Sequence, residues 1–122
     1  MKLSMRSKGF SLVEVLIALC ILSIALLALA GLMVTTTRNS SFGGNMTEAA
    51  TFAQDKVEEL KVSSWGSVVS GTDARTGATG INYARTWTVT DNANGTQRWV
   101  NITVSWNDVA SHTISFLSVI QP

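Results

Sequence analysis

The chain has 122 residues, and its 9 Lys and Arg residues nearly balance its 8 Asp and Glu residues, for a formal net charge of +1. This balance gives no reason to expect a nucleic-acid-binding domain, and the length allows one small domain with an appendage. A single Cys excludes an intramolecular disulfide framework, and a single His argues against a His-rich metal site. We therefore expect no metal and no cofactor.

Residues 10–34 form a long apolar segment in which Glu14 is the one charged residue. As a helix, this segment is roughly 37 Å long, which exceeds the ~30 Å hydrocarbon core of a bilayer. The rest of the chain is too small to bury a helix that is apolar all round, so the sequence predicts a transmembrane helix. A secretory signal is the alternative, because Ala28-Leu29-Ala30 fits an A-x-A cleavage site, but its apolar core is usually about 7–15 residues.

The segment before the apolar stretch is basic, with Lys2, Arg6 and Lys8 and no acidic residue. Positive residues near a membrane-spanning helix stay on the cytoplasmic side of the membrane. The sequence therefore predicts a cytoplasmic N-terminus, with residues 40–122 outside the cytoplasm.

Residues 8–16 read Lys-Gly-Phe-Ser-Leu-Val-Glu-Val-Leu, in which a basic leader ends at Gly9 and an apolar helix follows with Glu14 at its fifth position. This pattern resembles the prepilin processing motif of type IV pilins and type II secretion pseudopilins. The resemblance implies that a prepilin peptidase cuts between Gly9 and Phe10, removes residues 1–9 as a leader peptide, and methylates the new amine of Phe10. Gly9 has no side chain, so a protease can approach its backbone closely.

Glu14 is the unusual residue of this motif, because a carboxylate within an apolar membrane helix is energetically costly and normally has a partner. A Glu in the first turn also suits the positive end of the helix dipole. The resemblance implies that Glu14 pairs with the Phe10 amine of a neighbouring subunit and sets the axial register of the helices. From the residues alone, Glu14 could instead lie solvated at the level of the lipid headgroups.

Residues 35–45 are rich in Ser, Thr, Asn and Gly, which weaken a helix, so a break of the helix is possible near residues 39–45. Before this point we expect a transmembrane or pilus-core helix at residues 10–37, and after it a periplasmic or extracellular head at residues 38–122. The apolar residues of 46–62 recur at helical spacing, which predicts an amphipathic helix that packs on a sheet. Within it, residues 53–61 resemble a stretch of PilV-type minor pilins, the type IV pilus modification proteins.

The C-terminal half is typical of a small antiparallel sheet. Residues 63–81 are rich in Gly, Ser and Thr, which predicts a loop with room for a short strand. Three segments then alternate between apolar and polar residues, with a hairpin signal at Asn94-Gly95, which predicts a three-stranded meander over residues 82–120. The expected fold class is α+β, with a long N-terminal helix packed through its C-terminal half on the sheet.

Two residue groups that resemble sites are better explained as turns. Asp108, Ser111 and His112 are chain neighbours without a nucleophile elbow, so a hydrolase triad is not expected. Asp91 and Asn92 begin a fragment of a calcium loop, but the full ligand spacing is absent. We therefore expect no catalytic residues.

Aromatic and basic side chains in the C-terminal half could form a surface for nucleic acid or sugar. Aromatic residues in a small sheet belong more often to the core or to an interface, and we expect that role here. The side chains in question are Trp65, Trp87, Trp99, Arg85 and Arg98.

The resemblance implies a minor pilin that takes part in assembly or modification of a type IV pilus. Its partners would be the prepilin peptidase, inner-membrane lipid before assembly, and other major and minor pilin subunits through the N-terminal helix. After assembly it would lie in a cell-surface pilus or a periplasmic pseudopilus. A minor pseudopilin of type II secretion is the first alternative. A binding module anchored permanently by its helix is the second, and it predicts an uncut leader.

Overall fold

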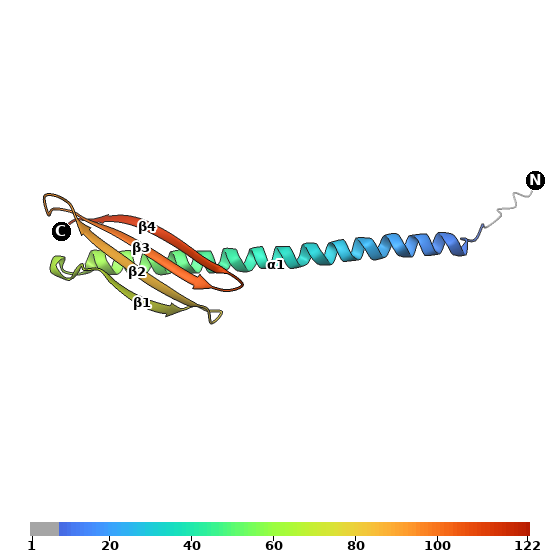
Figure 1. The fold of residues 1–122 in the computed structure, drawn as a ribbon, viewed down its shortest axis with the longest axis horizontal. Helices are drawn as coiled ribbons and strands as arrows, with labels where there is room; N and C mark the ends of the chain where they lie inside the picture. The colour runs from blue at the N-terminus through green and yellow to red at the C-terminus, as the bar shows by residue number, and fades with distance from the viewer. Residues whose placement is uncertain (1–7) are drawn as a thin grey trace, which may run out of the picture. The chain divides into compact units, whose positions relative to one another are not determined.

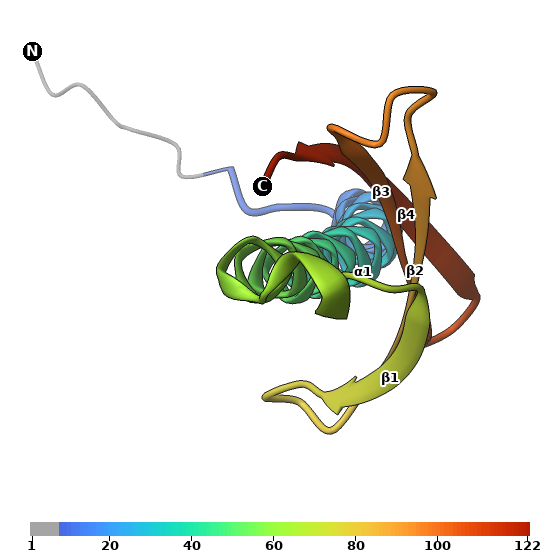
Figure 2. The same ribbon diagram turned by 90° about the vertical axis from the view of Figure 1, so that its left-hand side faces the viewer.

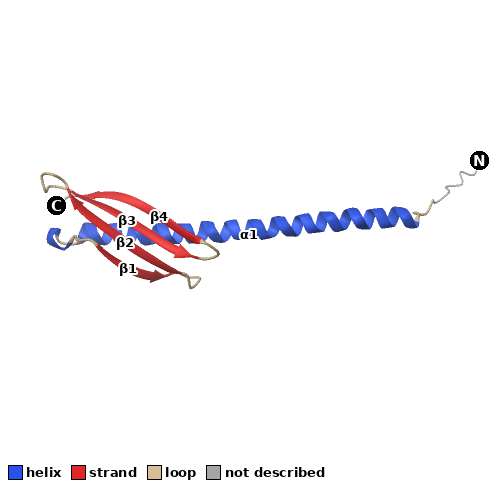
Figure 3. Cartoon of the chain, in the orientation of Figure 1, coloured by secondary structure: helices blue, strands red, loops and turns tan. Residues whose placement is uncertain are grey.

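The computed structural model describes residues 8–122, so the predicted leader charges Lys2 and Arg6 lie outside the described residues. One helix is followed by one sheet, which confirms the predicted α+β class (Figures 1 and 3). The elements in chain order are α1 (Leu12–Val62), the 3-10 helix η1 (Trp65–Ser67), β1 (Gly71–Thr76), β2 (Asn82–Asp91), β3 (Arg98–Asn107) and β4 (Ser111–Ile120).

The chain divides into two compact units after Ser41. We call the described residues of the first unit, 8–41, the stem, and the second unit, residues 42–122, the head. All residues of the stem are exposed, and α1 is long and apolar enough to cross a membrane, judged by length and composition. Stem hydroxyls are satisfied within the helix: Ser23 donates to the carbonyl of Leu19 at 2.7 Å, and Thr36 donates to that of Leu32 at 2.9 Å.

The helix continues through the segment where a break was possible, because α1 includes Gly43 and Gly44 without interruption. Directly after the glycine pair, Asn45 and Ala49 are buried against the sheet of the head. Most helical stability in proteins comes from such packing rather than from local propensity. Burial of this face therefore compensates for the two weak helix formers.

The sheet has four antiparallel strands in the order β1-β2-β3-β4, which is one strand more than the three expected over residues 82–120. The additional strand, β1, lies inside the segment 63–81 expected to be mainly loop, and it pairs with β2 from Gly71↔Trp87 to Thr76↔Asn82. Its sequence is Gly-Thr-Asp-Ala-Arg-Thr, which has no apolar alternation to mark a strand. Pairing with β2 and one buried ion pair hold it in the sheet instead.

Within the head, the C-terminal part of α1 covers one face of the curved sheet (Figure 2). Ala49 and Ala53 have no exposed area, and their small side chains let the helix approach the strands closely. Burial alternates along β2 and β3, which confirms the predicted faces of these strands. The sheet contributes Tyr83, Val100, Ile102, Val104, Trp106 and Ile120 to the core.

Candidate functional site

The predicted processing site lies just before the helix. Gly9 and Phe10 are exposed and have no regular secondary structure, and the Phe10 side chain is 82% exposed. An added Cβ at Gly9 would meet no atom within 4 Å. Proteolysis is concentrated in exposed backbone outside regular structure, so the Gly9–Phe10 bond is accessible to a peptidase.

Ser11 caps the N-terminus of α1. Its Oγ accepts a hydrogen bond from the backbone N–H of Glu14 at 3.2 Å, and its carbonyl accepts one from the N–H of Val15 at 3.2 Å. Ser11 is therefore the N-cap and Glu14 the third helical residue, which is the Ser-x-x-Glu spacing of a capping box. Sequence reasoning missed this role of Ser11, although the spacing was there to be read.

Glu14 lies in the first turn of α1, where a negative charge is favourable. Within residues 8–122, no cation forms an ion pair with its carboxylate. The predicted partner of Glu14 is the amine of another subunit, which a single chain does not contain. Lys8, the third predicted leader charge, is exposed directly before Gly9.

A buried cationic cluster connects the helix to the edge of the sheet. Arg85 has no exposed area; its Nε donates to Oδ1 of Asp73 at 2.6 Å and its Nη2 bonds the other carboxylate oxygen. Its Nη1 donates to the carbonyl of Phe52 on α1 at 2.9 Å. Lys56 adds a second buried cation, 3.6 Å from Asp73 and 4.1 Å above the ring of Trp87.

The electrostatics of this cluster centre on Asp73. The hydrogen bond from Arg85 lowers the pKa of Asp73 below its usual value, and the charges of Arg85 and Lys56 act in the same direction against partial desolvation. Three donors of the guanidinium are occupied by Asp73 and Phe52, which fixes its orientation. The cluster therefore fastens β1 and β2 to α1.

A second polar contact lies nearer the glycine pair of α1. Glu48 accepts a hydrogen bond from the Tyr83 hydroxyl at 2.9 Å and another from the backbone N–H of Ala78 at 2.7 Å. Burial, followed by the hydrogen bond to Glu48, raises the pKa of Tyr83 to about 12. Glu48 thus connects the helix to β2 and to the β1–β2 turn.

The hairpin between β3 and β4 is held by Asp108. The amide of Asn45 donates to its carboxylate at 3.2 Å, and a ring nitrogen of His112 lies 3.0 Å from it. Backbone N–H groups of the turn, that of Ala110 foremost, lower the pKa of Asp108. Ser111 donates to Asn107 at 2.6 Å rather than to His112, so these neighbours do not form a nucleophile–base pair.

The calcium-like fragment forms a turn. Asn92 Oδ1 accepts hydrogen bonds from the backbone N–H groups of Thr96 and Gln97, and Asp91 pairs with Arg98 at 2.7 Å. Gly95 has a φ of 64°, the left-handed conformation that a tight turn requires. Among residues 8–122, no cluster of three or more His, Cys, Asp or Glu side chains could hold a metal ion.

The tryptophans considered for a nucleic-acid or sugar surface do not share one face. Trp87 lies under Lys56, and Trp65 stacks with Arg98 at 4.4 Å from the guanidinium carbon to the ring centroid. Trp99 points to the opposite face of the sheet and is 47% exposed. Trp65 and Trp87 therefore pair with basic side chains within the head, apart from the exposed Trp99.

Residues 4–30 match the family model described as the prokaryotic N-terminal methylation motif. Comparisons with curated proteins and with solved structures gave no match. The chain thus carries the N-terminal motif of the type IV pilin and pseudopilin family on a pilin-like α+β fold. The motif indicates a type IV pilin-like or pseudopilin protein, and the long apolar helix fits anchoring in the inner membrane before assembly.

Proposed function

We propose that this protein is a minor pilin subunit of a type IV pilus, similar to PilV-type proteins, that takes part in pilus assembly or modification. It is made with leader 1–9, cut by a prepilin peptidase between Gly9 and Phe10, and methylated at the Phe10 amine. The observation that carries the proposal is the methylation motif at residues 4–30. Its support is the exposed Gly9–Phe10 bond beside a helix capped by Ser11.

The stem supplies the assembly energy in this proposal. Before assembly it lies in the inner membrane with the N-terminus in the cytoplasm. Afterwards its exposed apolar side chains are buried among the helices of neighbouring subunits, with small residues such as Ala18, Ala25 and Gly31 allowing close approach. The helix exposes an apolar surface from Leu12 to Val34, which is the surface such a bundle needs.

In this proposal, Glu14 sets the axial register between the helices of neighbouring subunits. In a bundle of apolar helices, a carboxylate and an amine are both costly to bury alone, and pairing them satisfies both. The Glu14 carboxylate of one subunit therefore accepts the Phe10 amine of the next, and this pairing fixes the axial offset between neighbours. Removal of the leader is required first, because it creates that amine.

The likeness of residues 53–61 to PilV-type proteins and the lack of a disulfide staple favour a minor rather than a major subunit. Lys56 of this stretch is buried in the cluster with Asp73, so part of the likeness belongs to the fold of the head. A minor pseudopilin of type II secretion would share the leader and the stem. The two alternatives differ in where the subunit assembles, which is a cell-surface pilus for a minor pilin and a periplasmic pseudopilus for a minor pseudopilin.

The test compares wild type with Glu14→Ala in cells that carry the prepilin peptidase. The fraction of the protein in sheared surface pili and in membranes is measured by quantitative mass spectrometry. We expect cleaved wild type in the sheared fraction, and Glu14→Ala cleaved but retained in the membrane. Glu58→Ala is the matched control, because Glu58 pairs with Lys61 on the exposed face of α1.

Equal amounts of wild type and Glu14→Ala in the sheared fraction would contradict the register role. Wild type that is cleaved but never sheared from the surface, together with loss of protein secretion when the gene is deleted, would favour the pseudopilin. A leader that is not cleaved would favour the other alternative, a binding module anchored permanently by its helix.

A further inference from the structure

The sheet has an outer face, which we define as the side chains that point away from α1. This face carries no charged residue among its strand positions, whereas the inner positions of the same strands include Asp73, Arg75, Arg85, Asp91 and Arg98. Its members are Thr72, Ala74, Thr76, Asn82, Ala84, Thr86, Thr88, Thr90, Trp99, Asn101, Thr103, Ser105, Asn107, Ser111, Thr113, Ser115, Leu117 and Val119.

The strand register arranges these side chains in rows across the sheet. One row runs Thr72, Thr86, Thr103 and Ser115, in which the first two hydroxyls lie 3.3 Å apart and the last two 3.0 Å apart. Similar contacts join neighbouring strands at one end of the sheet, where Thr76 donates to Asn82 at 2.9 Å. The outer face is thus a regular array of hydroxyl and amide groups.

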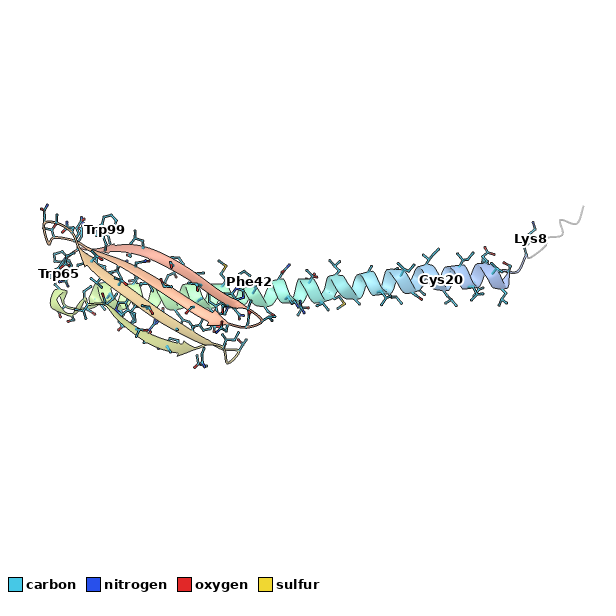
Figure 4. The ribbon with its side chains drawn as sticks, viewed as in Figure 1. Lys8, Cys20, Phe42, Trp65 and Trp99 are labelled. Atoms are coloured by element: carbon cyan, nitrogen blue, oxygen red, sulfur yellow. The ribbon has the colours of Figure 1, made fainter. Side chains whose placement is uncertain are left out.

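The array has a different feature at each end. Where Ala74 and Ala84 face each other, the small side chains leave a hollow of about 680 Å³, and Ser105 and Thr113 continue its floor. At the other end Trp99 is 47% exposed and lies opposite Val119, with Leu117 diagonally across on the same strand as Val119. Trp99 is at the end of the head that is remote from Phe42 (Figure 4).

We propose that the outer face of the sheet binds a neutral polysaccharide. Hydroxyl and amide groups can donate and accept hydrogen bonds, as the hydroxyl groups of a sugar require. The exposed ring of Trp99 offers an apolar plane on which the C–H face of a pyranose can stack. From Asn82 to Thr90 the strand spans roughly 27 Å, which accommodates a chain of several sugar units.

The lack of charged side chains on the outer face favours a neutral polysaccharide over charged polymers. Nucleic acids and acidic polysaccharides bind through Lys and Arg side chains, and the outer face has neither. A surface that binds a protein partner usually has an apolar centre and a polar rim. Here the centre is polar, at Thr86, Asn101 and Thr103, and the large apolar side chains, Trp99, Leu117 and Val119, lie toward one end.

The test uses the full processed chain in a zwitterionic detergent, since a sugar-based detergent would compete for the site. Retardation is measured in native gels that contain hydroxyethylcellulose, glucomannan or dextran, with heparin as the charged comparison. We expect retardation by at least one neutral polymer and none by heparin. Trp99→Ala should weaken the apparent affinity by about tenfold, as loss of one stacked ring does for other ligands.

Two further variants separate binding from folding. Trp99→Phe keeps an aromatic plane and should restore part of the affinity, whereas Thr88→Lys places a charge in the centre of the array and should weaken binding. Val109→Lys is the control, because Val109 is 86% exposed in the β3–β4 turn, off the strands of the outer face. Near-ultraviolet circular dichroism checks that each variant is folded.

Absence of retardation by all three neutral polymers would overturn the proposal. So would retardation that Trp99→Ala and Thr88→Lys leave unchanged. If the same two variants instead abolish co-purification with another pilin, the outer face is a subunit interface and the polysaccharide proposal is wrong. None of these readouts depends on pilus assembly.

Discussion

Arg85 and Asp73 form a two-point ion pair across neighbouring strands, with Nε of Arg85 2.6 Å from Oδ1 of Asp73. The guanidinium is completely buried and also binds the carbonyl of Phe52 on α1. One side chain therefore joins β1, β2 and the helix. The pair therefore adds a side-chain anchor to the backbone pairing that holds the polar strand β1 in the sheet.

Replacing Asp73 by Asn should destabilise the head strongly. The change leaves the buried Arg85 without a carboxylate partner, while Lys56 keeps Glu59, and removal of one member of a buried pair costs at most about 3–5 kcal/mol. Urea unfolding of the full chain in detergent micelles measures it, because all four Trp residues lie in the head and report its unfolding by fluorescence.

Asp91→Asn is the matched control. Asp91 pairs with Arg98, but its side chain is 58% exposed, and exposed pairs contribute less than about 1 kcal/mol. Equal losses of stability in the two variants would show that the buried pair has no special role.

Low pH should lower the stability of the head, because it protonates the carboxylate of Asp73. Because the folded pKa of Asp73 is below its ordinary value of 3.8, its contribution is complete above that value and is lost as the pH falls through the lower folded pKa. Urea midpoints of wild type should therefore decline below about pH 4, and those of Asp73→Asn should decline less. A decline of the same size in both proteins would assign the acid sensitivity to other groups, such as Asp108.

Tyr83 should ionise at unusually high pH. It is the single Tyr of the chain, so absorbance at 295 nm reports its phenolate directly. Burial and the hydrogen bond to Glu48 raise the pKa from 10.0 to about 12, so the folded protein should titrate near 12 and the urea-unfolded protein near 10. The raised pKa means that stability is complete below pH 10 and is lost, by about 3 kcal/mol, as the pH rises through 12.

Glu48→Gln provides the internal comparison for this titration. The variant removes the negative charge beside the phenol but leaves the burial, so its midpoint should fall between those of the folded wild type and the unfolded chain. A folded wild-type midpoint near 10 would contradict the buried Tyr83–Glu48 contact.

Ser11→Ala should loosen the first turn of α1. Loss of an N-cap costs about 1 kcal/mol, which corresponds to roughly fivefold faster hydrogen exchange at the amide of Glu14. Ser23→Ala is the control, because the Ser23 hydroxyl bonds a carbonyl within the helix and caps nothing. Unchanged exchange at Glu14 in Ser11→Ala would show that Ser11 is not the cap.

Gly77→Ala should disturb the Glu48 contact. A Cβ at this position would lie 2.6 Å from Cδ of Glu48 and 2.7 Å from Cε2 of Tyr83, so both side chains must move. We expect a loss of about 1–3 kcal/mol in urea unfolding, together with a lower pKa of Tyr83. Gly66→Ala, where the added Cβ meets no atom within 4 Å, should change neither quantity.

The sequence predicted the elements that carry periodic apolar residues. The apolar helix, the amphipathic helix and the inner faces of β2 and β3 are local patterns, and the structure confirms them. β1 was expected only as a possible short strand within a loop, because Asp73 anchors it and no local pattern predicts a partner 12 residues away. The helix through Gly43 and Gly44 was uncertain for the same reason, since packing of Asn45 and Ala49 stabilises it.

The processing motif could be read from the sequence, because leader, Gly9, Phe10 and Glu14 are adjacent in the chain. The side-chain contacts of the head could not be read from the sequence. The ion pair of Lys56 with Asp73 and its contact with the ring of Trp87 depend on how the helix and the strands pack. The opposite faces of Trp87 and Trp99 follow from the alternation along β2 and β3, whereas the contact of Trp65 with Arg98 depends on the fold.

The proposed function requires that the chain is made as a prepilin. Mass spectrometry of the N-terminus tests this requirement on protein purified from membrane and sheared surface fractions of cells that contain the prepilin peptidase. We expect a chain that begins at N-methylated Phe10 in the sheared fraction. A chain that retains residues 1–9 in both fractions would contradict it.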